Sequence, residues 1–427
     1  MIRRFFVWLH RWFGLAMALF LVIEGLTGSM LAFNAQLTKL FNPRLFVVSP
    51  KPGAAPLDPA TLAARVSQLV PQARMAYFAR VRDDQVVLRC SSVADPVTGK
   101  PYDIGFGYLV LDPYTGEELG RLKEGGYSEG FLPNVMPFIY SLHTSLALGA
   151  TGGWILFVVA VVWSVDCFVG FYLTLPTSFR RFWPRFGRAW LVKWGGGAFR
   201  LNFDLHRAGG LWLWPLLLVF AWSSVNLVDH LGVYEWVMGR LFDYEGTSTW
   251  ITKFYPHHPI GEPKLNWQAA QTAGDKLIRE QAASEGFKVV KPVSLNFFGY
   301  SGRYNYSVQT NRLFPRDRLA TVFFDANSGV FASTLETRTE RLGNTVSNWL
   351  RALHMITDPV DYLAYRVVVF IVGLGIAMLS VTGIYIWWRK RRARSFSASK
   401  RGSSRTPSSP NDTATSQSST AQLAKVK

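Results

Sequence analysis

Four long apolar runs constrain this chain more than any other feature. A helix needs about 20 apolar residues to cross the hydrocarbon core of a bilayer. Four segments meet that requirement, namely Phe13–Phe33, Trp154–Leu175, Leu211–Val228 and Val367–Trp388. Each holds at most one charged residue, and two polar stretches of domain size separate the first run from the second and the third from the fourth. We therefore predict an α-helical membrane bundle of four long transmembrane helices.

The positive charge of the chain is concentrated at the ends of these runs. The formal net charge is +18, and basic residues cluster before the first run, after the second and after the fourth. These clusters contain Arg3, Arg4 and Arg11, then Arg180, Arg181, Arg185, Arg188 and Lys193, and finally Arg389, Lys390, Arg391, Arg392 and Arg394. The positive-inside rule predicts cytoplasmic termini and two large loops on the other side of the membrane. Because the basic clusters adjoin membrane spans, we do not expect the chain to bind nucleic acid.

A short motif recurs at the start of the apolar runs. Leu9-His10-Arg11 precedes the first run, and Leu205-His206-Arg207 precedes the third. Looser copies, Leu142-His143 and Leu353-His354, stand some distance ahead of the second and fourth runs, where we expect short interfacial helices. Four of the seven histidines therefore mark the approaches to four spans.

The alternating direction of the spans sorts these histidines into two pairs. His10 and His206 fall at the cytoplasmic edge, whereas His143 and His354 fall at the outer edge. A haem iron with two axial imidazoles needs one histidine from each of two facing helices, and neutral imidazole suits iron. We therefore predict two haems, very roughly 20 Å apart across a hydrocarbon core of about 30 Å. Room for a flat macrocycle is expected at nearby glycines, namely Gly14, Gly209, Gly210, Gly149, Gly152 and Gly153.

Other polar residues are secondary candidates. Glu24 and Asp166 lie inside apolar runs, where a charge is costly, and are candidates for proton transfer or for binding a histidine. His230 is an alternative ligand of the outer haem, although an interfacial residue bonded to Asp229 or water is the simpler interpretation. The neighbouring residues His257 and His258 lie in an outer loop and are a weak candidate for a substrate or metal site.

The two polar stretches share one order of predicted elements. In the first stretch a helix at Leu57–Val70 precedes strands at Met75–Val81, Gln85–Cys90 and Gly107–Leu111. In the second a helix at Trp267–Glu285 precedes strands at Lys288–Phe297, Arg303–Gln309 and Leu319–Phe324. Both end in an Asp-x-x-Thr/Ser-Gly turn. With the repeated histidine motif, this order predicts an internal duplication that carries two α+β domains.

These predictions divide the chain into eight segments. The expected segments are transmembrane helix 1 (1–33), outer domain 1 (34–137), an interfacial helix with transmembrane helix 2 (138–176), a basic cytoplasmic loop (177–204), transmembrane helix 3 (205–228), outer domain 2 (229–349), an interfacial helix with transmembrane helix 4 (350–388), and a basic, disordered cytoplasmic tail (389–427). The tail is expected to be disordered because it is rich in Ser and Thr and poor in apolar residues.

The histidine motifs and the two turns together resemble the PepSY-associated transmembrane family. That family includes iron-regulated membrane proteins and ferric-siderophore reductases of the FoxB type. The resemblance rests on Leu9-His10-Arg11 with Gly14, Leu142-His143, Leu205-His206-Arg207 with Gly209, Leu353-His354, and the turns Asp112–Gly116 and Asp325–Gly329. It covers the chain from Met1 to about Arg394.

Membership implies a multi-pass protein of the bacterial inner membrane with two periplasmic PepSY-like domains and b-type haem. The implied activity is reduction of ferric siderophore in the periplasm, with electrons from quinol or a cytoplasmic reductant. Three alternatives remain open: a non-catalytic PepSY-type regulator that binds a periplasmic protein, a quinol-linked cytochrome with another acceptor, and a permease. The regulator would bind no cofactor, and the cytochrome would share the haems but fail to reduce ferric chelates. A permease would need polar groups along a path at the membrane midplane, and the apolar runs supply few of them: Glu24, Asp166, Ser223, Ser224 and Asn226.

Overall fold

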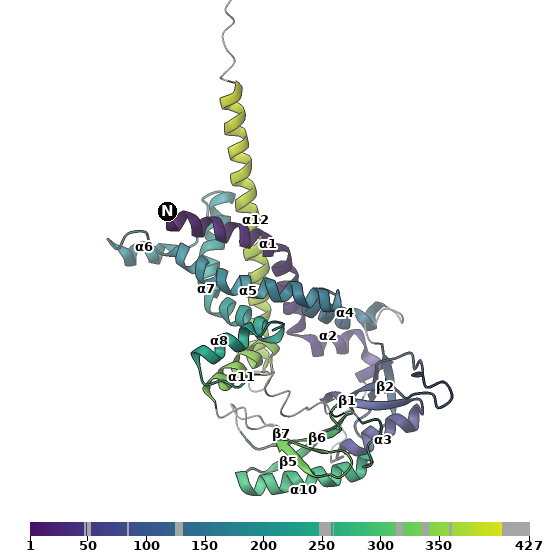
Figure 1. Cartoon of the computed structure of the whole chain (residues 1–427). Helices are drawn as coiled ribbons and strands as arrows, with labels where there is room; N and C mark the ends of the chain where they lie inside the picture. Colours follow the sequence, from purple (N-terminus) through teal and green to yellow (C-terminus); the bar gives the residue numbers. More distant parts are fainter. Residues whose placement is uncertain are drawn as a thin grey trace, which may run out of the picture.

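A computed structural model of the chain contains a bundle of long helices and two small sheets below it (Figure 1). The structure describes residues 1–46, 48, 53–82, 85–123, 131–246, 258, 260–312, 319–334, 341–357 and 361–403. We call the end of the bundle that faces the sheets the sheet end. The opposite end, where the N-terminus and Arg389–Arg394 lie, is the basic end.

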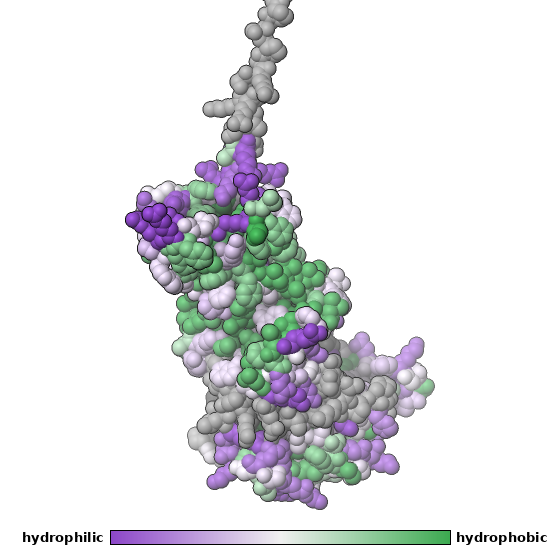
Figure 2. Space-filling view, turned by 60° about the vertical axis from the view of Figure 1, so that its left-hand side comes forward, coloured by the Kyte–Doolittle hydropathy of each residue, from purple (hydrophilic) through white to green (hydrophobic). Residues whose placement is uncertain are grey.

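Four helices of the bundle are long and apolar enough to cross a membrane. They are α1 (Ile2–Leu31), α5 (Gly149–Thr174), α7 (Ala198–Leu227) and α12 (Leu363–Ser403). Each contains most or all of one predicted apolar run. Figure 2 shows hydrophobic residues over the middle of the molecule and hydrophilic residues towards both ends. The chain is therefore a membrane protein with four membrane-spanning helices among its described residues.

Small residues allow α1 and α12 to pack closely. A Cβ atom on Gly25 would lie 2.5 Å from the carbonyl oxygen of Gly373, and one on Gly373 would meet Ser29 at a similar distance. The Ser29 hydroxyl hydrogen-bonds to the carbonyls of Gly25 and Phe370 at 2.8 and 2.9 Å. Because lipid is as apolar as a leucine side chain, helices in a membrane gain most of their association from such close contact. α7 packs against α5 and α12 and completes the bundle.

Shorter helices connect the long helices with one another and with the sheets. They are α2 (Asn34–Phe41), the 3-10 helix η1 (Pro43–Phe46), α4 (Phe131–Ser145), α6 (Phe182–Ala189), α8 (Val233–Leu241) and α11 (Leu342–Met355). α4 and α11 carry His143 and His354 and lead into α5 and α12. Left-handed backbone at Leu146 and Ala147 (φ 51° and 55°) separates α4 from α5. This arrangement agrees with the short helices predicted ahead of the second and fourth runs.

The two sheets have the same composition and order. The first unit contains α3 (Pro59–Leu69), β1 (Ala73–Arg82), β2 (Gln85–Ser92), β3 (Tyr108–Leu111) and β4 (Glu118–Leu122). The second contains α10 (Trp267–Glu285), β5 (Val289–Phe298), β6 (Arg303–Thr310), β7 (Leu319–Asp325) and β8 (Phe331–Thr334). Each sheet is antiparallel and follows chain order. The helices and the first three strands of each unit were predicted to within a few residues.

Equivalent turns follow the third strand of each unit. Asp112 Oδ1 accepts hydrogen bonds from the backbone of Tyr114 and Thr115, and Gly116 has a φ of 69°. In the second unit Asp325 Oδ1 accepts from the two corresponding backbone groups, and Gly329 has a φ of 73°. Aspartate tightens the turn through these bonds, and glycine permits the left-handed backbone.

The two units pack against each other through β1 and β5 and through α3 and α10. The backbone N–H of Phe78 donates to Asn296 Oδ1 at 2.8 Å, and that of Ala60 donates to Gln271 Oε1 at 2.8 Å. Trp267 packs against the cores of both units. The units therefore form one body next to the bundle.

Two features differ from expectation. The short edge strands β4 and β8 were not predicted. α12 continues as a helix to Ser403, through the first part of the segment that was expected to be disordered. No proline or glycine occurs between Arg389 and Lys400, and the Lys, Arg and Ala residues of this segment have high helix propensity. Residues 404–427 of the expected tail lie outside the described part of the chain.

Candidate functional site

The first histidine pair lies near the basic end of the bundle. The rings of His10 on α1 and His206 on α7 face each other, with centres 6.1 Å apart and an interplanar angle of 54°. His10 Nδ1 lies 3.0 Å from both carboxylate oxygens of Asp166 on α5. His206 Nδ1 lies 2.9 Å from the carbonyl oxygen of Leu379 and 3.1 Å from Thr382 Oγ1, both on α12. All four long helices therefore contribute to this pair.

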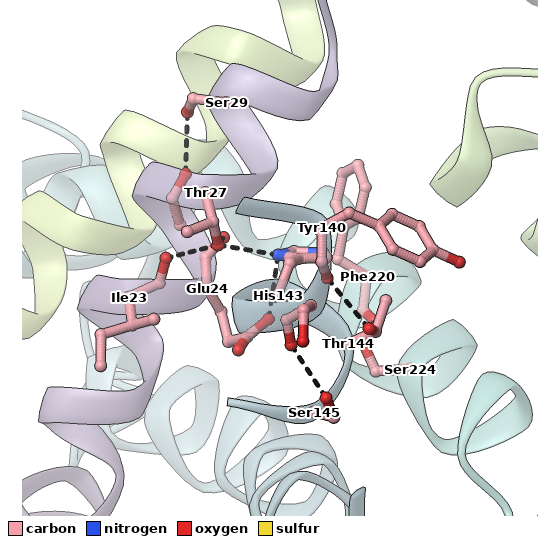
Figure 3. Close-up of polar contacts among 12 residues, drawn as sticks. Ile23, Glu24, Thr27, Ser29, Tyr140, His143, Thr144, Ser145, Phe220 and Ser224 are labelled. Carbon is pink, nitrogen blue, oxygen red and sulfur yellow. Dashed lines mark hydrogen bonds and ion pairs between the residues drawn. The ribbon is translucent and has the colours of Figure 1, made fainter. Parts of the chain in front are cut away.

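The second pair lies near the sheet end. The ring centres of His143 on α4 and His354 on α11 are 6.3 Å apart, with an interplanar angle of 57°. His143 Nδ1 lies 3.0 Å from Glu24 Oε2 and 2.9 Å from Thr27 Oγ1, both on α1. Figure 3 shows these two α1 side chains pointing to one edge of the His143 ring. His354 Nδ1 lies 2.7 Å from Ser223 Oγ on α7.

The spacing of both pairs suits one iron between two imidazoles. A metal–imidazole bond is about 2 Å long, and the ring centre lies about 1 Å beyond the nitrogen, so two axial rings hold their centres about 6 Å apart. The described hydrogen bonds of all four rings use Nδ1, which leaves Nε2 as the nitrogen that can bind iron. Metal-bound histidines almost always use their second nitrogen in this way.

A cavity of about 580 Å³ contains the second pair. Apolar residues of the bundle make up most of its lining, including Leu21, Leu31, Leu156, Val159, Phe220 and Ile376. Glu24, Asn34 and Arg351 are the charged or amide groups that line it. The size is within the range of cavities that hold cofactors. The apolar lining and the paired imidazoles fit a haem.

Burial and the nearby His143 lower the pKa of His354 to about 3. This imidazole is therefore neutral at physiological pH, which is the form that binds iron.

Three glycines make room for the imidazole rings. A Cβ atom on Gly28, Gly170 or Gly383 would lie 3.1, 3.5 or 3.2 Å from Cε1 of His143, His10 or His206, respectively. None of these glycines, and none of Thr27, Ser223 and Thr382, was predicted from the sequence to contact a histidine. Their contacts with histidine depend on how neighbouring helices are aligned and rotated, and no local sequence motif marks these positions.

The glycines that were expected to accommodate a macrocycle have other surroundings. A Cβ atom on Gly14 would meet nothing within 4 Å, whereas Gly152 lies against the backbone of Ser145, where α4 turns into α5. Gly209 contacts Met378 on α12. For these two the structure shows a role in helix packing, because adjacent backbone or side chains fill the space that was assigned to a ligand.

Two other candidate histidines, His230 and His258, are not part of either pair. The ring of His230 stacks on Trp154 with centres 4.5 Å apart and is not among the residues that line the cavity. His258 lies beside the second sheet, where its backbone N–H donates to the carbonyl of Tyr300 at 2.9 Å. His257 lies outside the described residues. Asp166 and Glu24 each bond a histidine, one in each pair.

Each site provides two histidine side chains as possible metal ligands. Within the described part of the chain, no three His, Cys, Asp or Glu side chains gather closely enough to hold a metal ion by themselves. A porphyrin iron needs only two axial ligands from the protein, and each pair supplies two imidazoles.

The two pairs lie at opposite ends of one bundle. His10 and Glu24, the α1 residues that belong to the two pairs, are fourteen positions apart in one helix. At a rise of 1.5 Å per residue the pairs are separated by about 20 Å along α1.

Comparison with known families identifies the chain. The family model described as the PepSY-associated TM region matches residues 7–390, which contain α5, α7 and both sheets and most of α1 and α12. No curated protein matches the chain. The resemblance inferred from the histidine motifs is confirmed, and the chain belongs to the family of the PepSY-associated TM region.

Proposed function

We propose that this protein is a dihaem electron carrier of the bacterial inner membrane that reduces ferric siderophore on the periplasmic side. The observation that supports this proposal is the presence of two histidine pairs, each at the spacing of one iron, at opposite ends of one bundle. His10 and His206 would hold one b-type haem, and His143 and His354 the other. A haem, when bound, supplies one-electron oxidation and reduction of its iron.

Side chains next to the histidines hold the imidazole rings in one orientation. Asp166, Glu24 and Ser223 each bind an Nδ1 nitrogen, which fixes the ring orientation and leaves Nε2 for a metal. An anionic acceptor also increases the electron density of the imidazole and stabilises the oxidised metal. The carboxylates of Asp166 and Glu24 would therefore make a haem bound at either site a better electron donor.

The charge distribution supports the proposed orientation. The basic residues of α12 and of the segment between α5 and α7 lie at one end of the bundle, which the positive-inside rule assigns to the cytoplasm. Both termini would then be cytoplasmic, and the two sheet units would be periplasmic domains. The shared element order and the equivalent aspartate turns support an origin by internal duplication.

Ferric chelates suit a one-electron reductant. Siderophores bind iron through hard oxygen ligands, which favour Fe(III), so that reduction to Fe(II) loosens the metal. The sheet end lies next to His143 and His354, where the proposed electron-transfer path across the membrane ends. We propose that the chelate docks at this end and that quinol or a cytoplasmic reductant supplies electrons near His10 and His206.

The proposal is tested by electron delivery from protein to chelate. Purified protein is reconstituted with haem, reduced under anaerobic conditions, freed of reductant and mixed with a ferric hydroxamate and an Fe(II)-specific dye. We expect the wild type to release one Fe(II) for each reduced haem. The variant His143→Ala/His354→Ala should release little Fe(II), and the control His230→Ala should release as much as the wild type. Reduced haem that persists beside an intact chelate contradicts the assignment of substrate. Reoxidation by another periplasmic acceptor instead would support the alternative cytochrome.

A further inference from the structure

A second cavity, of about 440 Å³, opens at the basic end of the bundle. It lies between the start of α1, the end of α5, α6 and the first turns of α7. Its polar lining consists of three arginines and two threonines, namely Arg3, Arg185, Arg207, Thr174 and Thr177. None of the described lining residues is acidic. The cavity is separate from both histidine pairs and has no part in the function proposed above.

Two of the arginines are held in place by backbone carbonyls. Arg3 donates to the carbonyl oxygens of Leu173 and Leu175 at 2.6 and 3.1 Å, at the C-terminal end of α5. Arg207 donates to the carbonyls of Arg188 and Ala189 at 3.1 and 3.2 Å. These bonds fix the guanidinium groups before any ligand arrives, so little side-chain entropy is lost on binding.

The positive charge of the cavity is only partly neutralised. Asp204 is fully buried and pairs with both Arg207 and Arg200, at 2.9 and 2.7 Å. That single carboxylate compensates at most one of the two. Arg3 and Arg185 have no carboxylate among their described partners, and Lys390 lies over the ring of Phe203, another lining residue. The cavity therefore attracts anions.

The residues around the cavity are of the kinds that occur at the level of lipid headgroups. α6 supplies Arg185, and around this short helix aromatic side chains are exposed: Phe179, Trp183 and Trp190 have 94%, 76% and 37% of their surface accessible. Aromatic rings beside arginines are typical of segments that lie in the interface between lipid and water. A lipid beside α6 can therefore place its headgroup in the cavity while its chains remain along the bundle.

We propose that this cavity binds the phosphate group of an anionic phospholipid. Guanidinium groups bind phosphate oxygens in pairs, and the two threonine hydroxyls can donate to the same oxygens. An anionic headgroup is preferred over a zwitterionic one because the choline cation of the latter would meet the uncompensated arginines. The lipid would tie α1, α5, α6 and α7 together at this end.

The test uses the full chain in detergent and short-chain lipids. Binding of dioctanoyl phosphatidylglycerol, dioctanoyl phosphatidylcholine and inorganic phosphate is measured for the wild type and for Arg3→Gln/Arg185→Gln. The control Arg180→Gln/Arg181→Gln removes the same charge from the same end outside the cavity lining. We expect phosphatidylglycerol to bind at least about tenfold more tightly than phosphatidylcholine, and the cavity variant to lose about tenfold while the control stays within about twofold.

The single variant Arg185→Gln controls for misfolding, because this side chain makes none of the described hydrogen bonds of the cavity. We expect its affinity for phosphatidylglycerol to fall about threefold. Equal binding of both lipids, or an equal loss in the control variant, overturns the proposal. Inorganic phosphate that competes with phosphatidylglycerol at similar affinity overturns the assignment to lipid and identifies a soluble phosphate as the ligand.

Discussion

Each histidine pair combines two different acceptors. His10 bonds the carboxylate of Asp166, whereas His206 bonds a backbone carbonyl and a threonine. In the other pair His143 bonds Glu24 and Thr27, whereas His354 bonds a serine. The carboxylate makes one imidazole of each pair, that of His10 or His143, more electron-rich than the other. Substitution of the carboxylate by an amide tests this effect alone.

We predict that Asp166→Asn raises the midpoint potential of the haem on His10 and His206. Asparagine keeps an oxygen acceptor but removes the negative charge that stabilises the oxidised iron. The expected rise is about 60 mV, a tenfold change in a one-electron equilibrium. Spectroelectrochemical titration measures both haems at once, and Glu24→Gln serves as the matched variant for the other. An unchanged potential of the haem beside the substituted residue contradicts the role assigned to the carboxylate.

The thiol of Cys90 gives a second prediction for a single residue. Cys90 is 3% exposed in the core of the first sheet unit, and burial raises the pKa of its thiol to about 11. Because the thiolate is the reactive form, about one thiol in 10⁴ is ionised at pH 7. We expect maleimide to leave Cys90 unlabelled in the native protein and to label it in urea, as mass spectrometry of the peptide would show. Fast labelling of the native protein would mean that the unit opens readily.

At this scale the sequence predicted the ligand candidates better than their partners. The four histidines stand in a recurrent motif, and Glu24 and Asp166 are conspicuous as isolated charges in apolar runs. Thr27 and Ser223 carry no such signal, because hydroxyl side chains in membrane helices commonly bond the carbonyl four residues earlier. Their contacts with histidine depend on how the helices are rotated.

Two glycines of α1 differ in how closely they pack. Gly25 lies against α12, where a larger residue would not fit, whereas Gly14 has space beside it. Gly25 faces α12 with a backbone oxygen 2.5 Å from the position of an added Cβ, whereas Gly14 in the same helix has no neighbour within 4 Å. We predict that Gly25→Ala destabilises the bundle by about 1–3 kcal/mol, since an overpacked site must shift its backbone. Gly14→Ala is the matched control and should be neutral or stabilising.

Thermal unfolding in detergent measures both variants. A lower melting temperature for Gly25→Ala alone supports the close packing of α1 on α12. Equal melting temperatures would show that the two helices are not in contact at this point.

Regular elements were predictable where their pattern was long. The helix Trp267–Glu285 begins after an Asn266 cap and ends at Gly286, with a φ of 73°, so that both ends carry sequence signals. β4 and β8 have five and four residues and lie at sheet edges. Such strands are specified by pairing with their neighbour rather than by an alternating pattern, and the sequence alone did not reveal them.

At the scale of the molecule the repeated order of elements produces the two sites. Each half of the chain contributes one histidine from a long helix and one from a short helix, and the halves meet so that like histidines face each other. Alternating helix direction predicted which two histidines share each edge of the bundle, whereas the contact between their rings depends on helix rotation and comes from the structure. The sequence could not predict that the two sheet units pack through β1 and β5, because side chains such as Asn296 and Gln271 carry no local sign of a distant partner.

The central claim is that each histidine pair holds one haem, and haem quantitation with a visible spectrum tests it most directly. We predict two haems per chain in the wild type, with the low-spin spectrum of bis-imidazole iron. His10→Ala/His206→Ala and His143→Ala/His354→Ala should each retain one. A wild type that binds no haem when haem is supplied, or double variants that both retain two, would contradict the account.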